Sequence, residues 1–206
     1  MSIRQPERDS RTVDLLRHGE TEAGDIFRGQ VEDPLSETGW VQMGAAVAQR
    51  QWDLIITSPL GRCRNFAVRL GDESATEVIT DPRLAEYNFG DWDGMRYDLV
   101  MAQDADSVEK FFADPFNFTP PNAEEFSVFH DRVVAAWEAL SKDRTESSIL
   151  VVTHGGVIMS ILADIMGMER IHGRIDVGYA SLSRIRLGGE GMTHRLVSHG
   201  AREVAA

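Results

Sequence analysis

Two short apolar runs, each stopping at a histidine followed by glycine, constrain the fold of this chain more than any other feature. The first, Leu15-Leu16, ends at Arg17-His18-Gly19, and the second, residues 149–153, ends at His154-Gly155-Gly156. Apolar runs of this length bounded by glycine are typical of strands buried in a parallel sheet. Ligands of such sheets bind beyond the carboxyl ends of the strands. We therefore expect the two histidines to converge on one ligand site.

Segments of strand type and helix type alternate through most of the chain. We predict strands around residues 13–16, 53–58, 78–80 and 149–153, and a terminal hairpin formed by residues 181–187 and 192–197. Strands separated by helices predict a largely parallel sheet with helices on both faces. The length of 206 residues is that of a single domain.

Helix boundaries are predicted from capping residues. Ser36 is a plausible N-cap, and Pro59 can occupy the first turn of a helix that Gly71 closes. Asn122, followed three residues later by Glu125, resembles a helix-start box. The apolar residues after it recur every three or four positions and predict a buried stripe: Phe126, Phe129, Val133, Trp137 and Leu140.

Composition limits the classes of function. A formal net charge of −12 argues against general nucleic-acid or anionic-membrane binding. The single cysteine, Cys63, allows no intramolecular disulfide, suits a reducing compartment and is expected to be a small buried side chain. The apolar runs are too short to span a bilayer, and the first residues lack the apolar core of a secretory signal. We expect a cytoplasmic protein whose residues 1–10 form a flexible terminus.

Four blocks, in this order along the chain, together resemble the histidine phosphatase superfamily, the phosphoglycerate mutase-like proteins. They are Arg17-His18-Gly19-Glu20-Thr21, Ser58-Pro59-Leu60-Gly61-Arg62-Cys63, Glu86-Tyr87-Asn88-Phe89-Gly90-Asp91-Trp92-Asp93-Gly94 and Thr153-His154-Gly155-Gly156. The resemblance implies an α/β fold, a three-layer α/β/α sandwich with a mostly parallel sheet, one antiparallel edge strand and a helical cap insertion. We expect a single domain over residues 11–206, with the cap or lid at about 84–122.

The resemblance also implies a mechanism. His18 attacks phosphorus and carries the phosphoryl group as a phosphohistidine, which water then hydrolyses. We expect the other ring nitrogen of His18 to be held by the carbonyl of Gly19. Glu86 is implied as the general acid that protonates the leaving alkoxide.

The cationic and polar groups of the same four blocks are expected to stabilise the negative charge of the phosphoryl group. By resemblance Arg17, Arg62 and His154 contact the transferring phosphoryl group, whose charge is spread over its peripheral oxygens. The amides of Gly155 and Gly156, at the start of a helix, are expected to add positive potential. We therefore expect no metal and no cofactor.

Further contacts to the phosphate or substrate are expected from Thr21 and Arg28, as well as from Gly155. The family often places an asparagine a few residues after Arg-His-Gly to bind the phosphoryl group. Gly24 stands at that position here, so this contact is not expected in the same form.

Within the superfamily, the chain most resembles the α-ribazole-5′-phosphate phosphatases, which act in assembling the nucleotide loop of cobalamin. The residues that carry this likeness include Phe27-Arg28-Gly29-Gln30, Asp33-Pro34-Leu35-Ser36 and Pro121-Asn122-Ala123-Glu124. The broader family favours Gly-Gly-Glu-Ser where this chain has Asn122-Ala123-Glu124-Glu125.

The function and partners follow from this likeness only in part. A broad-specificity small-molecule phosphatase is the alternative. A phosphoglycerate mutase and a catalytically silent module that binds a phospholigand are more distant. The expected partner is a small phosphorylated metabolite, with no nucleic acid and no membrane. The sequence leaves the oligomeric state open, and a homodimer is compatible with it.

Overall fold

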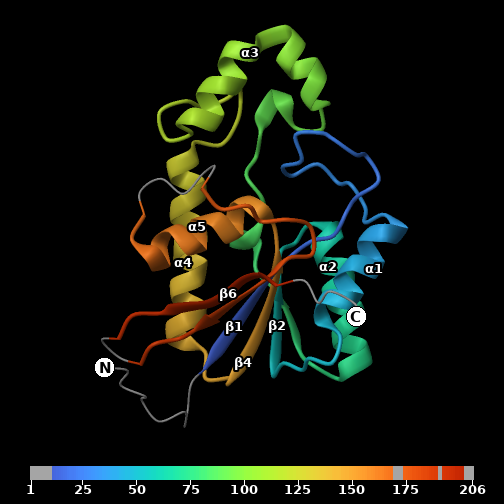
Figure 1. Ribbon diagram of the computed structural model, residues 1–206, viewed down its shortest axis with the longest axis vertical. Helices are drawn as coiled ribbons and strands as arrows, with labels where there is room; N and C mark the ends of the chain where they lie inside the picture. The colour runs from blue at the N-terminus through green and yellow to red at the C-terminus, as the bar shows by residue number, and fades with distance from the viewer. Residues whose placement is uncertain (1–10, 169–173, 190–191, 202–206) are drawn as a thin grey trace.

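A mixed sheet forms the centre of the protein (Figure 1). The computed structural model describes residues 11–168, 174–189 and 192–201, so the predicted flexible terminus at residues 1–10 lies outside the described residues. Within these ranges the sheet has six strands: β1 (Thr12–Arg17), β2 (Leu54–Thr57), β3 (Val78–Thr80), β4 (Ser148–Thr153), β5 (Leu182–Arg186) and β6 (Arg195–Ala201). Their order across the sheet is β3-β2-β4-β1-β5-β6.

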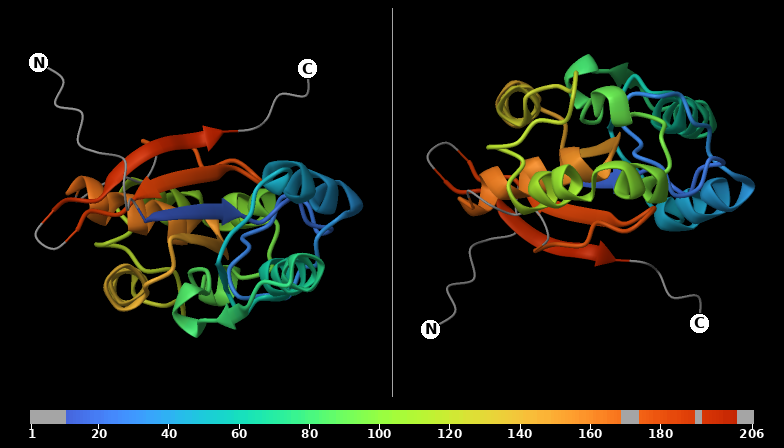
Figure 2. Two further views of the ribbon diagram at one scale, coloured as in Figure 1. Left: turned by 90° about the horizontal axis from the view of Figure 1, so that it is seen from below. Right: turned by 90° about the horizontal axis from the view of Figure 1, so that it is seen from above.

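Most of the sheet is parallel, as predicted. Strands β3, β2, β4 and β1 run in one direction, whereas β5 is antiparallel to β1 and β6 is antiparallel to β5. The antiparallel strand was expected at the edge, but β5 lies second from it because β6 completes the predicted hairpin and takes the edge (Figure 2). The carboxyl ends of the four parallel strands therefore meet along one side of the sheet.

Helices cover both faces of the sheet and complete the three layers. Helices α1 (Glu37–Val47) and α2 (Gly61–Ser74) pack on one face, and α4 (Phe126–Asp143) and α5 (Gly155–Met166) pack on the other (Figure 1). Successive strand residues point to opposite faces, so Leu15 joins the core with α4 and α5 while Leu16 joins the core with α1 and α2. The predicted fold class is confirmed.

Side chains predicted to be buried form much of these two cores. The stripe on α4 is buried along its whole length, at Phe126, Phe129, Val133, Trp137 and Leu140. Cys63 is also fully buried. In the described ranges, no helix combines the length and the apolar character that crossing a bilayer requires.

The predicted start of α1 is confirmed, but the predicted end of α2 is wrong. The hydroxyl of Ser36 accepts a hydrogen bond from the amide of Gly39 at 3.0 Å. Helix α2 continues through Gly71 and ends at Ser74, after which Ala75 has a left-handed φ of 53°. A Cβ at Gly71 would lie 2.3 Å from Val78 Cγ2. The glycine therefore permits close packing of α2 against β3 and does not close the helix.

The helix-start box predicted at Asn122 is also wrong. Helix α4 begins at Phe126, with Glu125 as its N-cap and no side-chain capping bond. Asn122 has a φ of 57°, and its amide donates to Asp91 Oδ1 at 3.0 Å. Asn122 thus lies in a turn that precedes α4.

Asp14 is a carboxylate in the middle of buried strand β1. Arg184, its register partner on β5, donates from Nε and Nη2 to the two carboxylate oxygens, both at 2.7 Å. The indole Nε1 of Trp52 donates to the same carboxylate at 2.9 Å. A bidentate pair with a further donor satisfies a carboxylate that would otherwise be costly to bury.

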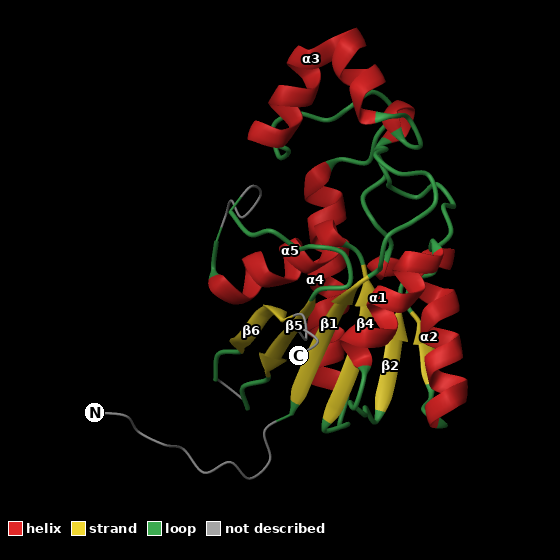
Figure 3. Cartoon of the chain, turned by 45° about the vertical axis from the view of Figure 1, so that its right-hand side comes forward, coloured by secondary structure: helices red, strands yellow, loops and turns green. Residues whose placement is uncertain are grey.

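The long segment between β3 and α4 lies beyond the carboxyl ends of the strands (Figure 3). It contains α3 (Tyr97–Ala113), whose helical path is broken at Asp104, where φ is −154° and ψ is 70°. The role of residues 84–122 as a cap or lid stays a prediction.

Candidate active site

The parallel register brings the two predicted histidines together. Arg17 and Thr153 are paired residues at the ends of β1 and β4, and His18 and His154 follow them. The two imidazole rings lie with their centroids 5.3 Å apart at an angle of 62°. They therefore meet at one point despite the long stretch of chain between them.

His18 is held in the tautomer that a nucleophile needs. Its Nδ1 lies 2.8 Å from the carbonyl oxygen of Gly19, as expected. A carbonyl only accepts, so Nδ1 carries the proton and Nε2 keeps a free lone pair. Burial, followed by the charges of Arg62 and Arg17, holds the pKa of His18 well below its usual value. At neutral pH the ring is uncharged.

His154 lies fully buried beside two side chains from the β2–α2 segment. Its Nε2 is 2.7 Å from the hydroxyl of Ser58 and 3.6 Å from the sulfur of Cys63. Burial, and then the charge of Arg62, lowers the pKa of His154 well below its usual value. This imidazole is therefore also neutral at neutral pH.

Two guanidinium groups supply positive charge next to these rings. Arg62 is buried and donates to the carbonyls of Val31 at 3.0 Å and Gly29 at 2.5 Å. The Arg17 guanidinium lies 4.3 Å from the centroid of the Tyr179 ring. Of the contacts that the described residues make, none reaches the buried Nε of either arginine. Both arginines keep N–H donors for an anion.

Glu86 comes from the loop after β3 and is held by two backbone amides. Its carboxylate accepts from the amides of Tyr87 and Gly156, each at 3.0 Å. Burial raises the pKa of Glu86 above that of an ordinary glutamate, although these bonds and the nearby arginines oppose the shift. Gly155 and Gly156 were both expected to direct their amides at phosphate, but Gly156 uses its amide for Glu86. More of the carboxyl group is protonated near neutral pH than in a solvated glutamate.

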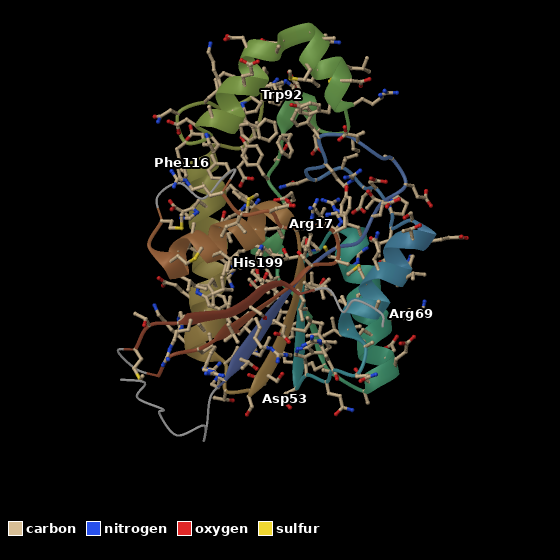
Figure 4. The ribbon with its side chains drawn as sticks, in the orientation of Figure 1. Arg17, Asp53, Arg69, Trp92, Phe116 and His199 are labelled. Carbon is tan, nitrogen blue, oxygen red and sulfur yellow. The ribbon has the colours of Figure 1, made fainter. Side chains whose placement is uncertain are left out.

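A cavity of about 420 Å³ opens onto this cluster. Arg17, Glu86 and Gly155 line it, whereas His18, Arg62 and His154 are buried and do not. Figure 4 shows Arg17 beyond the strand ends and Trp92 farther out near α3. Nine aromatic side chains contribute to the cavity wall: Phe27, Tyr87, Phe89, Tyr97, Phe111, Phe112, Phe126, Phe129 and Tyr179.

The remaining predicted binding residues lie in different settings. Arg28 lines the cavity, where it donates to Asp33 at 2.6 Å and to the hydroxyl of Tyr179 at 3.1 Å. Arg28 also donates to the carbonyl of Gly24, an exposed residue with a φ of 70°. Thr21 is buried and does not line the cavity.

Two residues of the cluster were missed from the sequence. Ser58 directly follows β2, so its place at a strand end was a signal like that of the histidines. Tyr179 contacts Arg17, Arg28 and the His18 ring, whose centroid is 5.7 Å away. No local pattern marks Tyr179, because these partners lie some 150 residues or more earlier in the chain.

The class of protein is shown by comparison with known families. The family model described as the histidine phosphatase superfamily (branch 1) matches residues 13–199, and the chain belongs to this superfamily. It is a phosphatase, a hydrolase that acts on a phosphorylated small molecule.

The chain is similar to phosphatases that are named for two different substrates. Glucosyl-3-phosphoglycerate phosphatase from Mycolicibacterium vanbaalenii is 32% identical over 194 residues, which cover 87% of this chain and 84% of the relative. Adenosylcobalamin/alpha-ribazole phosphatase from Escherichia coli is 31% identical over 172 residues, covering 80% and 85%.

Solved structures of the same two kinds share the fold. The alpha-ribazole phosphatase from Shigella flexneri has a TM-score of 0.83 and 26% identity, covering 95% of this chain and 98% of its own. A mycobacterial glucosyl-3-phosphoglycerate phosphatase complexed with VO3 has a TM-score of 0.79 and 28% identity, covering 93% and 99%.

The contact between Glu86 and the start of α5 can be tested with two helical glycines. A Cβ at Gly156 would lie 2.5 Å from Glu86 Oε1, whereas a Cβ at Gly44, an exposed residue of α1, would meet nothing within 4 Å. Gly156→Ala must therefore displace the carboxylate, and we expect it to lower kcat/KM for an alkyl phosphate about 100-fold.

Gly44→Ala is the matched control, and we expect a loss of no more than about threefold because the added methyl group contacts nothing in the site. Thermal unfolding of both variants separates an effect on the site from an effect on the fold. Equal losses of activity in the two variants would contradict the importance of this contact.

Proposed function

We propose that the protein is a metal-independent phosphomonoesterase that works through a phosphohistidine at His18, with α-ribazole 5′-phosphate as its substrate. One observation carries the catalytic part of this proposal. The buried Nε donors of Arg17 and Arg62 have no acceptor among the described residues, and both lie beside an uncharged imidazole. Buried donors normally have partners, and the peripheral oxygens of a phosphoryl group would supply them.

In the first step, Nε2 of His18 attacks phosphorus and the bond from phosphorus to the ester oxygen breaks. Arg17 and Arg62 stabilise the charge on the peripheral oxygens. Glu86 gives its proton to the departing oxygen, so the alcohol leaves neutral. Gly19 stabilises the positive charge that develops on the imidazole, because its carbonyl accepts from Nδ1.

In the second step, water attacks the phosphoryl group and the bond from nitrogen to phosphorus breaks. Glu86, now a carboxylate, takes the proton from the water. Inorganic phosphate and the free His18 imidazole result. His154 is neutral beside the cations, and a bound phosphate dianion raises its pKa by Coulombic attraction, which would allow it to add positive charge.

The Glu86 role is tested by replacing Glu86 with glutamine, which cannot give up a proton. We expect kcat/KM for an alkyl phosphate to fall about 100-fold. For p-nitrophenyl phosphate, whose leaving group needs little protonation, we expect a fall of less than about tenfold. Equal slowing of the two esters would contradict the role.

The pH profile of the alkyl ester gives an independent readout. The acid must be protonated, so the rate falls as pH rises through the raised pKa of Glu86. His18 must be neutral, so the rate falls on the acid side only well below the ordinary histidine pKa. Glu86→Gln should remove the alkaline fall and keep the acid one.

The choice of α-ribazole phosphate is supported by the cavity wall. Glucosyl-3-phosphoglycerate carries a carboxylate and a sugar but no aromatic ring, and the cavity lining includes the acidic side chains of Asp25 and Asp176 as well as those of Arg17 and Arg28. The benzimidazole ring of α-ribazole is flat, aromatic and without negative charge. Aromatic rings pack favourably with one another, so the lining favours the nucleotide.

The substrate proposal is tested by phosphate release from three esters, each with and without EDTA. Ribose 5-phosphate is the control, because it keeps the phosphoribose and lacks the aromatic ring. We expect kcat/KM for α-ribazole phosphate to exceed that for ribose 5-phosphate by about 30-fold, as expected for burying one ring. Glucosyl-3-phosphoglycerate should be slower still, and EDTA should change nothing.

Equal rates on all three esters would favour a broad-specificity phosphatase. Faster hydrolysis of glucosyl-3-phosphoglycerate would contradict the proposed substrate. Activity lost to EDTA would contradict the metal-independent mechanism.

A further inference from the structure

Arg132 on α4 uses every N–H of its guanidinium in a hydrogen bond to the segment around Glu86. Its Nη1 donates to the carbonyls of Arg83 at 2.8 Å and Ala85 at 2.7 Å. Its Nη2 donates to the carbonyl of Glu86 at 3.1 Å and to Glu124 Oε2 at 2.9 Å. Nε donates to Glu124 Oε1 at 2.7 Å, which completes the five donors of an arginine.

Other side chains brace the same segment. The hydroxyl of Thr153, next to His154, donates to the carbonyl of Leu84 at 3.0 Å. Together with the contacts of Arg132, this gives each of the four successive carbonyls at residues 83–86 a side-chain donor. Glu124 also holds Asn88 through two hydrogen bonds. The backbone amide of Glu124 donates to the Asn88 carbonyl at 3.0 Å, and the backbone amide of Asn88 donates to Glu124 Oε2 at 3.3 Å.

This segment needs such support because it belongs to no strand. Between the short 3₁₀ helix Pro82–Leu84 and the next one at Gly90–Trp92, the chain has no sheet neighbour to accept or donate its backbone bonds. The Glu86 carboxyl also has to reach the amide of Gly156 on α5. Small displacements of a catalytic group are costly, since an error of about 1 Å can lower a rate about 100-fold.

We propose that Arg132 and Glu124 are positioning residues that hold the Glu86 backbone so that its carboxyl proton reaches the leaving oxygen. The inference rests on the proposed acid role of Glu86. It also assigns a role to Glu124, which belongs to the stretch Asn122-Ala123-Glu124-Glu125, where this chain differs from the broader family. Both side chains are mostly buried, at 21% and 15% exposure, so the pair is shielded from solvent. A shielded bidentate pair fixes geometry in a way that a surface ion pair does not.

The test replaces Arg132 with lysine, which keeps the charge but offers three donors from one point. We expect kcat/KM for an alkyl phosphate to fall about 10- to 100-fold, and that for p-nitrophenyl phosphate to fall less than about threefold. Arg83→Lys is the matched control. Arg83 lies in the same segment, but its side-chain hydrogen bonds among the described residues go to Asp81 and the Ala135 carbonyl, and we expect no selective loss.

A double-mutant cycle separates positioning from general loosening of the fold. In the Glu86→Gln background, Arg132→Lys should have no further selective effect on the alkyl ester, because there is no proton to position. Equal slowing of both esters by Arg132→Lys, or a selective loss that persists in that background, would overturn the inference. If Arg132→Lys does not fold, Glu124→Gln replaces it in the same measurements, with the same expected selective loss for the alkyl ester.

The two proposals fail in different ways. If Glu86→Gln itself shows no preference between leaving groups, then the acid role is wrong. If Glu86→Gln is selective and the Arg132 and Glu124 variants are not, then only the positioning role is wrong.

Discussion

Two neighbouring guanidinium groups, Arg62 buried and Arg17 half-buried, lie beside two uncharged imidazoles, and the rest of the site depends on this arrangement. Burying like charges close together is unfavourable, and burial lowers the pKa of both Arg17 and Arg62. A backbone carbonyl and the Tyr179 ring contact the Arg17 guanidinium, and two backbone carbonyls accept from Arg62. The Nε donors of both arginines stay without an acceptor among the described residues. An anionic phosphoryl group, as we propose, would relieve the repulsion. Burial, and then the charges of the same arginines, lowers the pKa of both histidines. In the proposed mechanism, the cations that bind the phosphoryl group therefore also help to keep the nucleophile uncharged.

The sheet positions most of these groups, and the segments beyond its strands line the cavity that opens onto them. Parallel strands end together, which places residues 17–18, 58 and 153–154 side by side. Glu86 comes from an irregular segment, so its place depends on side-chain donors from α4 and from the end of β4. The aromatic side chains of the cavity wall come from α3, from α4 and from residues outside the strands. In the proposed mechanism, the strand ends thus place both histidines and Arg17, whereas an irregular segment places the acid Glu86.

Much of the fold and of the site could be predicted from local patterns. Buried strands and the α4 stripe carry their own periodicity, and the strand-end rule placed His18 and His154 together. The errors have a common cause. Gly71 resembled a helix end, but its role is set by Val78 on a neighbouring strand. Asn122 resembled a cap but bonds to Asp91, and Tyr179 and Arg132 act on partners far along the chain. Such contacts leave no periodic trace in a single sequence.

The central claim is a covalent bond between phosphorus and His18, and trapping that species tests it most directly. The protein is mixed with a phosphate monoester, quenched at alkaline pH within the turnover time and digested for mass spectrometry, with His18→Ala as the parallel sample. The account predicts one added phosphoryl group on His18 and none in the variant, whose thermal unfolding should match that of the unaltered protein. A phosphoryl group on another residue, or full turnover by His18→Ala, would contradict it.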